Sequence, residues 1–148
     1  MTAEDSYWDS SALRCLYIHA THSAAVAAWR HRHPGSLTVT RFGRAEVINA
    51  IAGAAFRTEI SNAAAEQALS TLATDFSSGD LRLVDLGWRA ALDRAAELSG
   101  LHTPKLGTRT LDVLHVASAL ELGARVLVTY DLRQAALARV VGLKTLAP

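Results

Sequence analysis

Short apolar runs alternate with helical segments along almost the whole chain, and this alternation restricts the possible folds more than any other feature of the sequence. Strand-like runs are predicted at residues 7–9, 37–40, 81–84, 125–129 and 143–146. Segments with the apolar spacing of helices lie between them, at residues 10–19, 21–33, 44–53, 58–78, 86–99, 111–122 and 132–141. The alternation predicts a three-layer α/β/α fold with a mostly parallel central sheet flanked by helices on both faces.

Residues 108–134 contain two acids that lie at the ends of neighbouring elements. A buried helix is predicted to start at Thr110, which can cap it, and to end at Gly123, where a left-handed cap is expected. Asp112 lies in the first turn of this helix. Asp131 lies just beyond the strand that follows, at the carboxyl edge where open α/β sheets bind ligands.

Each of these acids also has a purely structural interpretation. Asp112 is favoured at a helix N-terminus by the helix dipole alone. Asp131 followed by Gln134 matches the pattern of a capping box. Neither acid, taken singly, distinguishes a cap from a functional site, so the rest of the chain has to decide.

Length and composition narrow the class of protein. The 148 residues carry 50% hydrophobic and 20% charged side chains, as expected of one globular domain with a sizeable core. The net charge of +1 provides no broad cationic field, so any contact with nucleic acid needs a local patch. Cys15 is the single cysteine, which excludes an intrachain disulfide and a cysteine-based zinc site. No signal peptide or membrane span is evident, which predicts a soluble cytoplasmic protein.

Two further acids have positions similar to that of Asp131. Asp9 ends the first predicted strand, and Glu46 lies near the start of the helix after the second strand. With Asp112 and Asp131, they can reach one edge of one sheet. Four carboxylates packed together repel one another unless a cation neutralises them, and Mg²⁺ or Mn²⁺ suits such oxygen ligands. Such ions promote phosphodiester hydrolysis, whereas the absence of a Gly-rich phosphate loop argues against a P-loop nucleotide hydrolase.

Several of these motifs resemble those of a known family. The segments are residues 7–13, 45–50, 111–120, 127–131 and 142–146, which together span nearly the whole chain. They are similar to the PIN-domain ribonucleases, and most closely to the VapC toxins of bacterial type II toxin–antitoxin (VapBC) pairs. The resemblance implies a single PIN domain over residues 1–148.

The resemblance also implies an activity, a set of site residues and partners. One or two Mg²⁺ or Mn²⁺ ions would be held by the acids Asp9, Glu46, Asp112 and Asp131. Thr129 and Ser11 would support the site through their hydroxyls. The implied activity is endonucleolytic cleavage of RNA by a homodimer. The implied partner is a small VapB-like antitoxin whose tail blocks the acidic pocket, often with an arginine, a cation that pairs well with carboxylates.

Basic and histidine side chains near the acids have a less definite role. The chain departs from the family pattern at Arg14, Cys15 and Arg41, none of which belongs to the acid set. Candidate contacts to RNA phosphate are Arg14, Arg41, Arg109 and Arg133. Arg109 and Arg133 flank the third and fourth acids, where they can bind phosphate or merely balance the acidic charge. His115 is predicted to be a buried, hydrogen-bonded structural residue, and His19 with His22 is not expected to form a zinc pair.

Two other functions remain open from the sequence. One is a receiver-like signalling domain that is phosphorylated on an Asp, although the third strand ends in Asp85 away from the expected pocket. The other is a PIN-like protein that binds RNA or a partner without cleaving RNA. An intact set of acids argues against this non-catalytic alternative.

Overall fold

A five-stranded, wholly parallel sheet forms the centre of the protein, which a computed structural model describes over residues 1–148. The strands are β1 (Ser6–Trp8), β2 (Leu37–Thr40), β3 (Leu81–Val84), β4 (Val126–Val128) and β5 (Lys144–Leu146). Their order is β3-β2-β1-β4-β5, with parallel pairing throughout. The five strands lie within two residues of the predicted ones, and the α/β prediction is confirmed.

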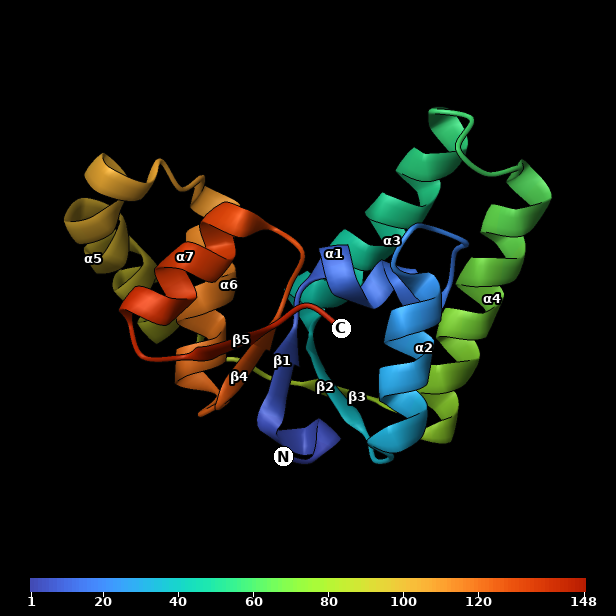
Figure 1. The fold of residues 1–148 in the computed structure, drawn as a ribbon, viewed down its shortest axis with the longest axis horizontal. Coiled ribbons are helices and arrows are strands. Elements are labelled where there is room, and N and C mark those ends of the chain that lie inside the picture. Colours follow the sequence, from blue (N-terminus) through green and yellow to red (C-terminus); the bar gives the residue numbers. More distant parts are fainter.

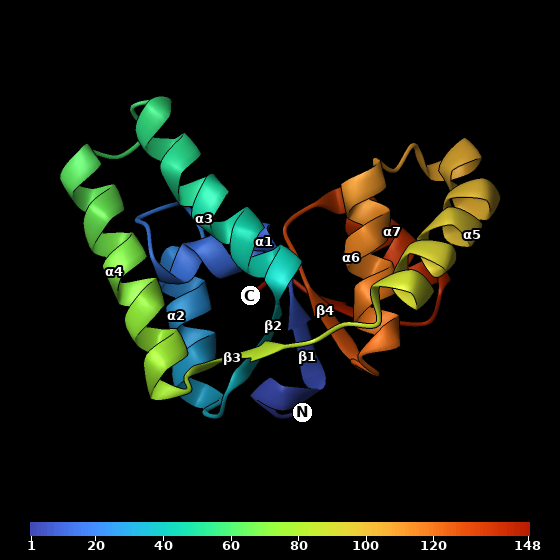
Figure 2. The same ribbon diagram turned by 180° about the vertical axis from the view of Figure 1, so that it is seen from behind.

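Seven α-helices cover the two faces of the sheet. They are α1 (Ser10–Leu13), α2 (Ser23–Arg32), α3 (Arg41–Phe56), α4 (Asn62–Ser78), α5 (Trp88–Leu106), α6 (Thr110–Glu121) and α7 (Leu132–Val140). Figures 1 and 2 show α1 to α4 on one side of the sheet and α5 to α7 on the other. The protein therefore has three layers, as predicted. None of the helices combines the length and the apolar character that crossing a lipid bilayer requires.

The sheet separates two apolar cores because successive side chains of a strand point to opposite faces. In β1, Trp8 enters the core under α1 to α4, where its ring lies 5.2 Å from that of Trp29. Its neighbour Tyr7 enters the core under α5 to α7, together with Leu127 of β4. Both faces of the central strands are thus buried, which explains their continuous apolar sequence.

The helices around β2 begin and end where capping side chains place them. The predicted helix 44–53 extends in fact from Arg41 to Phe56, because the hydroxyl of Thr40 at the end of β2 accepts a hydrogen bond from the Gly43 amide at 2.9 Å. The next helix begins at Asn62 and not at Thr58, which has a positive φ of 58°. Likewise, the predicted helix 10–19 shortens to α1 and a single 3₁₀ turn, Arg14–Leu16.

The largest difference from the predicted elements is in α5. The sequence predicts that Gly100 ends this helix and that residues 101–107 form a loop, but α5 continues to Leu106 through both Gly100 and Pro104. The helix ends at Gly107, which adopts a left-handed φ of 62° and donates its amide proton to the Thr103 carbonyl at 2.8 Å. The apolar face of α5, which packs against α6, outweighs the low helix propensity of one glycine.

The glycine inside α5 provides a test of this explanation. A Cβ added at Gly100 would meet no atom within 4 Å, so Gly100→Ala should stabilise the protein by about 0.5–1 kcal/mol. Thermal denaturation should show an increase in Tm of about 1–4 °C. The same change at Gly107 should destabilise the protein, since its φ is positive. A Gly100→Ala protein with an unchanged or lower Tm would contradict the explanation.

Candidate active site

The acids lie at the point in the sheet where the order of the strands reverses. From β1 the chain proceeds to β2 and β3 on one side, whereas β4 and β5 lie on the other side of β1. The carboxyl ends of β1 and β4 therefore flank the crevice where doubly wound sheets bind ligands. A pocket of about 320 Å³ opens there, and its lining residues are Asp9, Ser10, Ser11, Glu46, Arg109, Thr110, Leu111, Asp112, His115, Asp131 and Gln134. We call it the acidic pocket.

Asp9 is the most deeply buried acid of the pocket, with 2% of its surface exposed. It immediately follows β1 and caps α1, although the Ser10-Ser11 pair in the sequence predicts that one of these two serines is the cap. Its Oδ1 accepts hydrogen bonds from the Ala12 amide at 3.0 Å and from the Ser11 hydroxyl at 2.7 Å. Its Oδ2 accepts one from the Thr129 hydroxyl at 2.7 Å. These three donors hold the carboxylate in one orientation.

The two supporting hydroxyls also join the carboxyl ends of β1 and β4. Thr129 accepts a hydrogen bond from the Asp131 amide at 3.0 Å, and Ser11 accepts one from the Tyr130 amide at 2.9 Å. Each hydroxyl thus bonds both to Asp9 and to the turn after β4. The structure places the hydroxyls of Thr129 and Ser11 beside Asp9.

Burial raises the pKa of Asp9, although His115 and the hydrogen bonds to Ser11, Thr129 and Ala12 partly oppose this shift. A carboxyl whose pKa is raised in the folded state destabilises that state once it ionises. The destabilisation is absent below the ordinary pKa of 3.8 and grows as the pH rises through the raised value. The charge on Asp9 therefore costs stability at neutral pH when no cation is bound.

Asp9→Asn should consequently stabilise the protein in the presence of EDTA at pH 7, by about 1 kcal/mol. The gain should disappear near pH 3.5, where the wild-type carboxyl is itself protonated. Urea denaturation at the two pH values measures the difference. Asp93→Asn, on the exposed face of α5, is the matched control and should change nothing. An Asp9→Asn protein that is less stable than the wild type at pH 7 would disprove the interpretation.

Arg109 connects two acids of the pocket. Its Nε and Nη2 donate to the two carboxylate oxygens of Asp112 at 3.0 and 3.1 Å, and Nη2 also donates to Asp131 at 2.7 Å. The Arg109 amide donates to Asp112 at 2.9 Å, so Arg109 occupies the N-cap position of α6 that the sequence assigned to Thr110. Hydrogen bonding and the charge of Asp112 raise the pKa of Arg109, and Asp131 adds to the shift. One guanidinium thus neutralises both acids.

Asp131 caps α7 as predicted, but the capping box is only half formed. Its Oδ1 accepts hydrogen bonds from the Arg133 amide at 2.9 Å and the Gln134 amide at 3.0 Å. The return bond from the Asp131 amide to Gln134 is missing, because that amide donates to Thr129 instead. The Oε1 atom of Gln134 is therefore buried without a hydrogen-bond partner beside the acidic pocket. A buried acceptor of this kind is costly unless a ligand or water satisfies it.

Glu46 enters the pocket from the second turn of α3, and His115 holds it there. His115 Nε2 bonds to Glu46, and Nδ1 bonds to the Tyr7 hydroxyl at 2.9 Å. The Glu46 carboxylate can only accept, so Nε2 of His115 carries the proton, and in the neutral imidazole Nδ1 then accepts a hydrogen bond from the Tyr7 hydroxyl. The Ser10 hydroxyl donates to the other Glu46 oxygen at 3.3 Å. His115 is buried and hydrogen-bonded as predicted, but its partner is an acid of the site.

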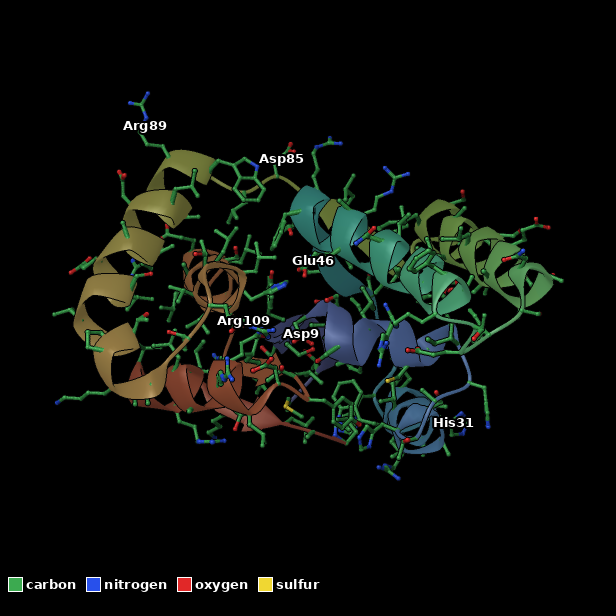
Figure 3. The ribbon with its side chains drawn as sticks, turned by 90° about the horizontal axis from the view of Figure 1, so that it is seen from above. Asp9, His31, Glu46, Asp85, Arg89 and Arg109 are labelled. Atoms are coloured by element: carbon green, nitrogen blue, oxygen red, sulfur yellow. The ribbon has the colours of Figure 1, made fainter.

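The candidate phosphate contacts have separate locations. Arg109 lies inside the acidic pocket, and Figure 3 shows it near Asp9 and Glu46. Arg14 lines a neighbouring pocket. Arg41 instead forms an exposed ion pair with Asp85 at 3.3 Å, and Arg133 is exposed on α7. Asp85 lines no part of the acidic pocket, which weakens the receiver-like alternative.

The donor set fits a hard divalent cation by its chemistry. Four carboxylates line one pocket, and all of them are oxygen ligands. As the side chains stand, no group of three or more His, Cys, Asp or Glu residues could hold a metal ion. Arg109 already supplies a positive charge between Asp112 and Asp131, while His115 binds Glu46. A cation would therefore have to displace Arg109.

Sequence reasoning missed several side chains of the pocket. Local patterns identify Ser10 and Gln134 only as caps, and His115 only as a core residue. The spacing of His115, three residues after Asp112, does place both on one side of α6 and is a signal that could have linked them. For Gln134 no such signal exists, because its unpartnered oxygen depends on a hydrogen bond between Asp131 and Thr129.

Comparisons with known proteins add information on the fold. No protein-family model and no curated protein matches the chain. Among solved structures, the crystal structure of PAE2754 from Pyrobaculum aerophilum is similar, with a TM-score of 0.63 and 22% sequence identity. The match covers 97% of this chain and 84% of that chain. At this level of identity the similarity extends to the fold alone, and it agrees with the α/β architecture described above.

Proposed function

We propose that this chain is a metal-dependent endoribonuclease of the PIN-domain kind, and that it acts in the cytoplasm as the toxin of a type II toxin–antitoxin pair. The observation that carries the proposal is the convergence of four carboxylates on one pocket at the carboxyl ends of β1 and β4. The motifs that resemble VapC toxins support the choice of RNA as the substrate.

Each side chain would have a distinct role in this activity. Mg²⁺ or Mn²⁺ would be held by the carboxylates Asp9, Glu46, Asp112 and Asp131. Such an ion lowers the pKa of a water and neutralises charge on the phosphate. Thr129 and Ser11 orient Asp9, and His115 orients Glu46. These supporting contacts keep the carboxylates from rearranging when the substrate binds.

The proposed partners follow from the same resemblance. A VapB-like antitoxin would block the acidic pocket, and the active toxin would be a homodimer. If this is correct, induced expression of the chain should arrest bacterial growth, and co-expression of a small protein encoded beside it should restore growth. The Asp112→Asn chain should allow growth by itself.

Cleavage of total bacterial RNA, including tRNA, tests the central proposal. Antitoxin-free protein is incubated with the RNA in Mg²⁺, in Mn²⁺ and in EDTA, and the fragments are separated by size. Discrete fragments that require metal and disappear in Asp9→Asn protein are expected. Tight RNA binding that persists in EDTA, without cleavage in either metal, would favour the non-catalytic alternative. A stable acyl phosphate after acetyl phosphate treatment would favour the receiver-like alternative.

The contacts of Arg109 predict how cation binding responds to its removal. Arg109→Ala should tighten Mn²⁺ binding by about three- to tenfold, because the guanidinium no longer competes for Asp112 and Asp131. Isothermal titration with Mn²⁺ in the absence of RNA measures this effect apart from any contact of Arg109 with phosphate. Arg89→Ala is the matched control, since Figure 3 shows Arg89 directed into solvent from α5. Weaker Mn²⁺ binding by Arg109→Ala would contradict the prediction.

A further inference from the structure

A second pocket adjoins the acidic pocket and has a different chemistry. It has a volume of about 370 Å³ and lies between residues 11–22 and the turn after β4. It shares the lining residues Ser11 and Asp131 with the acidic pocket, so the two pockets lie next to each other at these residues. A polymer held at the carboxylates can therefore extend into the second pocket.

A pair of stacked rings lines the second pocket. The rings of His22 and Tyr130 lie 3.9 Å apart between centroids, with an angle of 11° between their planes. The Tyr130 hydroxyl donates to the Pro148 carbonyl at 2.7 Å, and the Tyr130 amide donates to the Ser11 hydroxyl. These two bonds fix the position of the Tyr130 ring. His22 is exposed, and no other aromatic ring covers its outer face. A flat, supported and solvent-facing ring of this kind is a platform on which a nucleobase stacks.

An arginine without an ion-pair partner lines the same pocket. Arg14 is half-buried there, and none of the ion pairs of the structure includes its guanidinium. This distinguishes Arg14 from Arg41 and Arg109, whose charges are already paired with acids. The planar guanidinium matches the geometry of phosphate oxygens. An aromatic platform and an unpaired arginine in one pocket are together the recognition groups for a nucleotide.

We propose that the second pocket binds the nucleotide of single-stranded RNA that lies next to the phosphate in the acidic pocket. The base stacks on the outer face of His22, and the phosphate of the same strand pairs with Arg14. The inference rests on the proposed function, because it takes the acidic pocket as the place of cleavage. The strand is single because a base within a duplex cannot present its face to a side chain.

Fluorescence anisotropy with a short fluorescein-labelled single-stranded RNA, in EDTA and at low salt, tests the assignment without cleavage. His22→Ala and Arg14→Ala should each weaken binding about tenfold. His22→Phe should retain the affinity, since it preserves the flat ring. Arg14→Ala should also reduce the dependence of binding on salt by about one phosphate contact, whereas His22→Ala should leave that dependence unchanged.

Matched controls come from α2, where His31 and Arg32 are both exposed. Figure 3 places His31 well away from Asp9 and Glu46. His31→Ala and Arg32→Ala should bind the RNA with the wild-type affinity. In Mn²⁺, His22→Ala should raise KM for cleavage about tenfold and change kcat by less than about twofold, the result expected of a residue that binds substrate away from the reacting atoms.

Several results would overturn the inference. They are wild-type affinity in His22→Ala and Arg14→Ala, equal losses in the α2 controls, equal binding of fully duplex RNA, and tighter binding of single-stranded DNA of the same sequence. The outcome is separable from that of the proposed function. If the wild-type protein binds RNA through His22 and Arg14 but never cleaves it, the proposed nuclease activity is wrong and the proposed nucleotide-binding pocket is supported. If the variants cleave and bind RNA like the wild type, only the proposed nucleotide-binding role of the second pocket is wrong.

Discussion

Asp112→Asn should abolish metal-dependent RNA cleavage, with a loss of about 10³-fold or more. Asp112 is 4% exposed and lies in the first turn of α6, where its carboxylate faces the same pocket as Asp9 and Asp131. Removing one negative charge from the cluster that is proposed to bind a divalent cation should weaken both the binding of that cation and the stabilisation of charge on the phosphate. A loss of about 4 kcal/mol of transition-state stabilisation corresponds to that factor.

The substitution is expected to leave the fold intact. Asparagine keeps an oxygen that can accept the Arg109 amide proton, so the start of α6 retains its cap. Gel-based cleavage assays and isothermal titration with Mn²⁺ measure the two losses, and circular dichroism verifies the fold. Asp93→Asn, an exposed acid of α5, should cleave at the wild-type rate. Undiminished cleavage by folded Asp112→Asn protein would refute the proposed site.

His115→Phe should destabilise the protein by about 2–4 kcal/mol. His115 is 2% exposed and bonds to Tyr7 on one side and to Glu46 on the other. Phenylalanine fills a similar volume but leaves a buried hydroxyl and a carboxylate without their partner, and each loss costs about 1–3 kcal/mol. For a chain of this size, Tm should fall by about 4–16 °C.

A double-mutant cycle identifies the source of the loss. Tyr7→Phe should cost much less in the His115→Phe background than in the wild type, because the hydroxyl has already lost its partner. Cleavage should also fall by about tenfold or more, since Glu46 is no longer held in one position. His102→Phe, on α5, is the control. Additive effects of the Tyr7 and His115 changes would show that the two side chains do not act together.

The elements that could be predicted were those determined by local sequence. Each strand is a short apolar run bounded by turn residues, and hydrophobic spacing alone locates such runs to within about two residues. The positions of Asp9 and Asp131 followed directly, because each acid lies within three residues of the end of a buried strand. Since parallel strands share one carboxyl edge, the alternation of strands and helices predicts that both acids lie at that edge, whereas the pairing of β1 with β4 brings them close together. The helix ends were less predictable, and Gly100 shows the reason: packing of α5 against α6 outweighed a local stop signal.

The sequence by itself thus determined the layered α/β architecture and the edge at which the acids lie, because both depend on periodicity and on the handedness of short connections. Only the tertiary structure decided how the acids are paired. The bond between Glu46 and His115 joins residues 69 positions apart, and the second pocket joins His22 to Tyr130. These contacts depend on strand order and side-chain orientation, which are set by how the helices pack on the sheet. No local pattern in a single sequence encodes them.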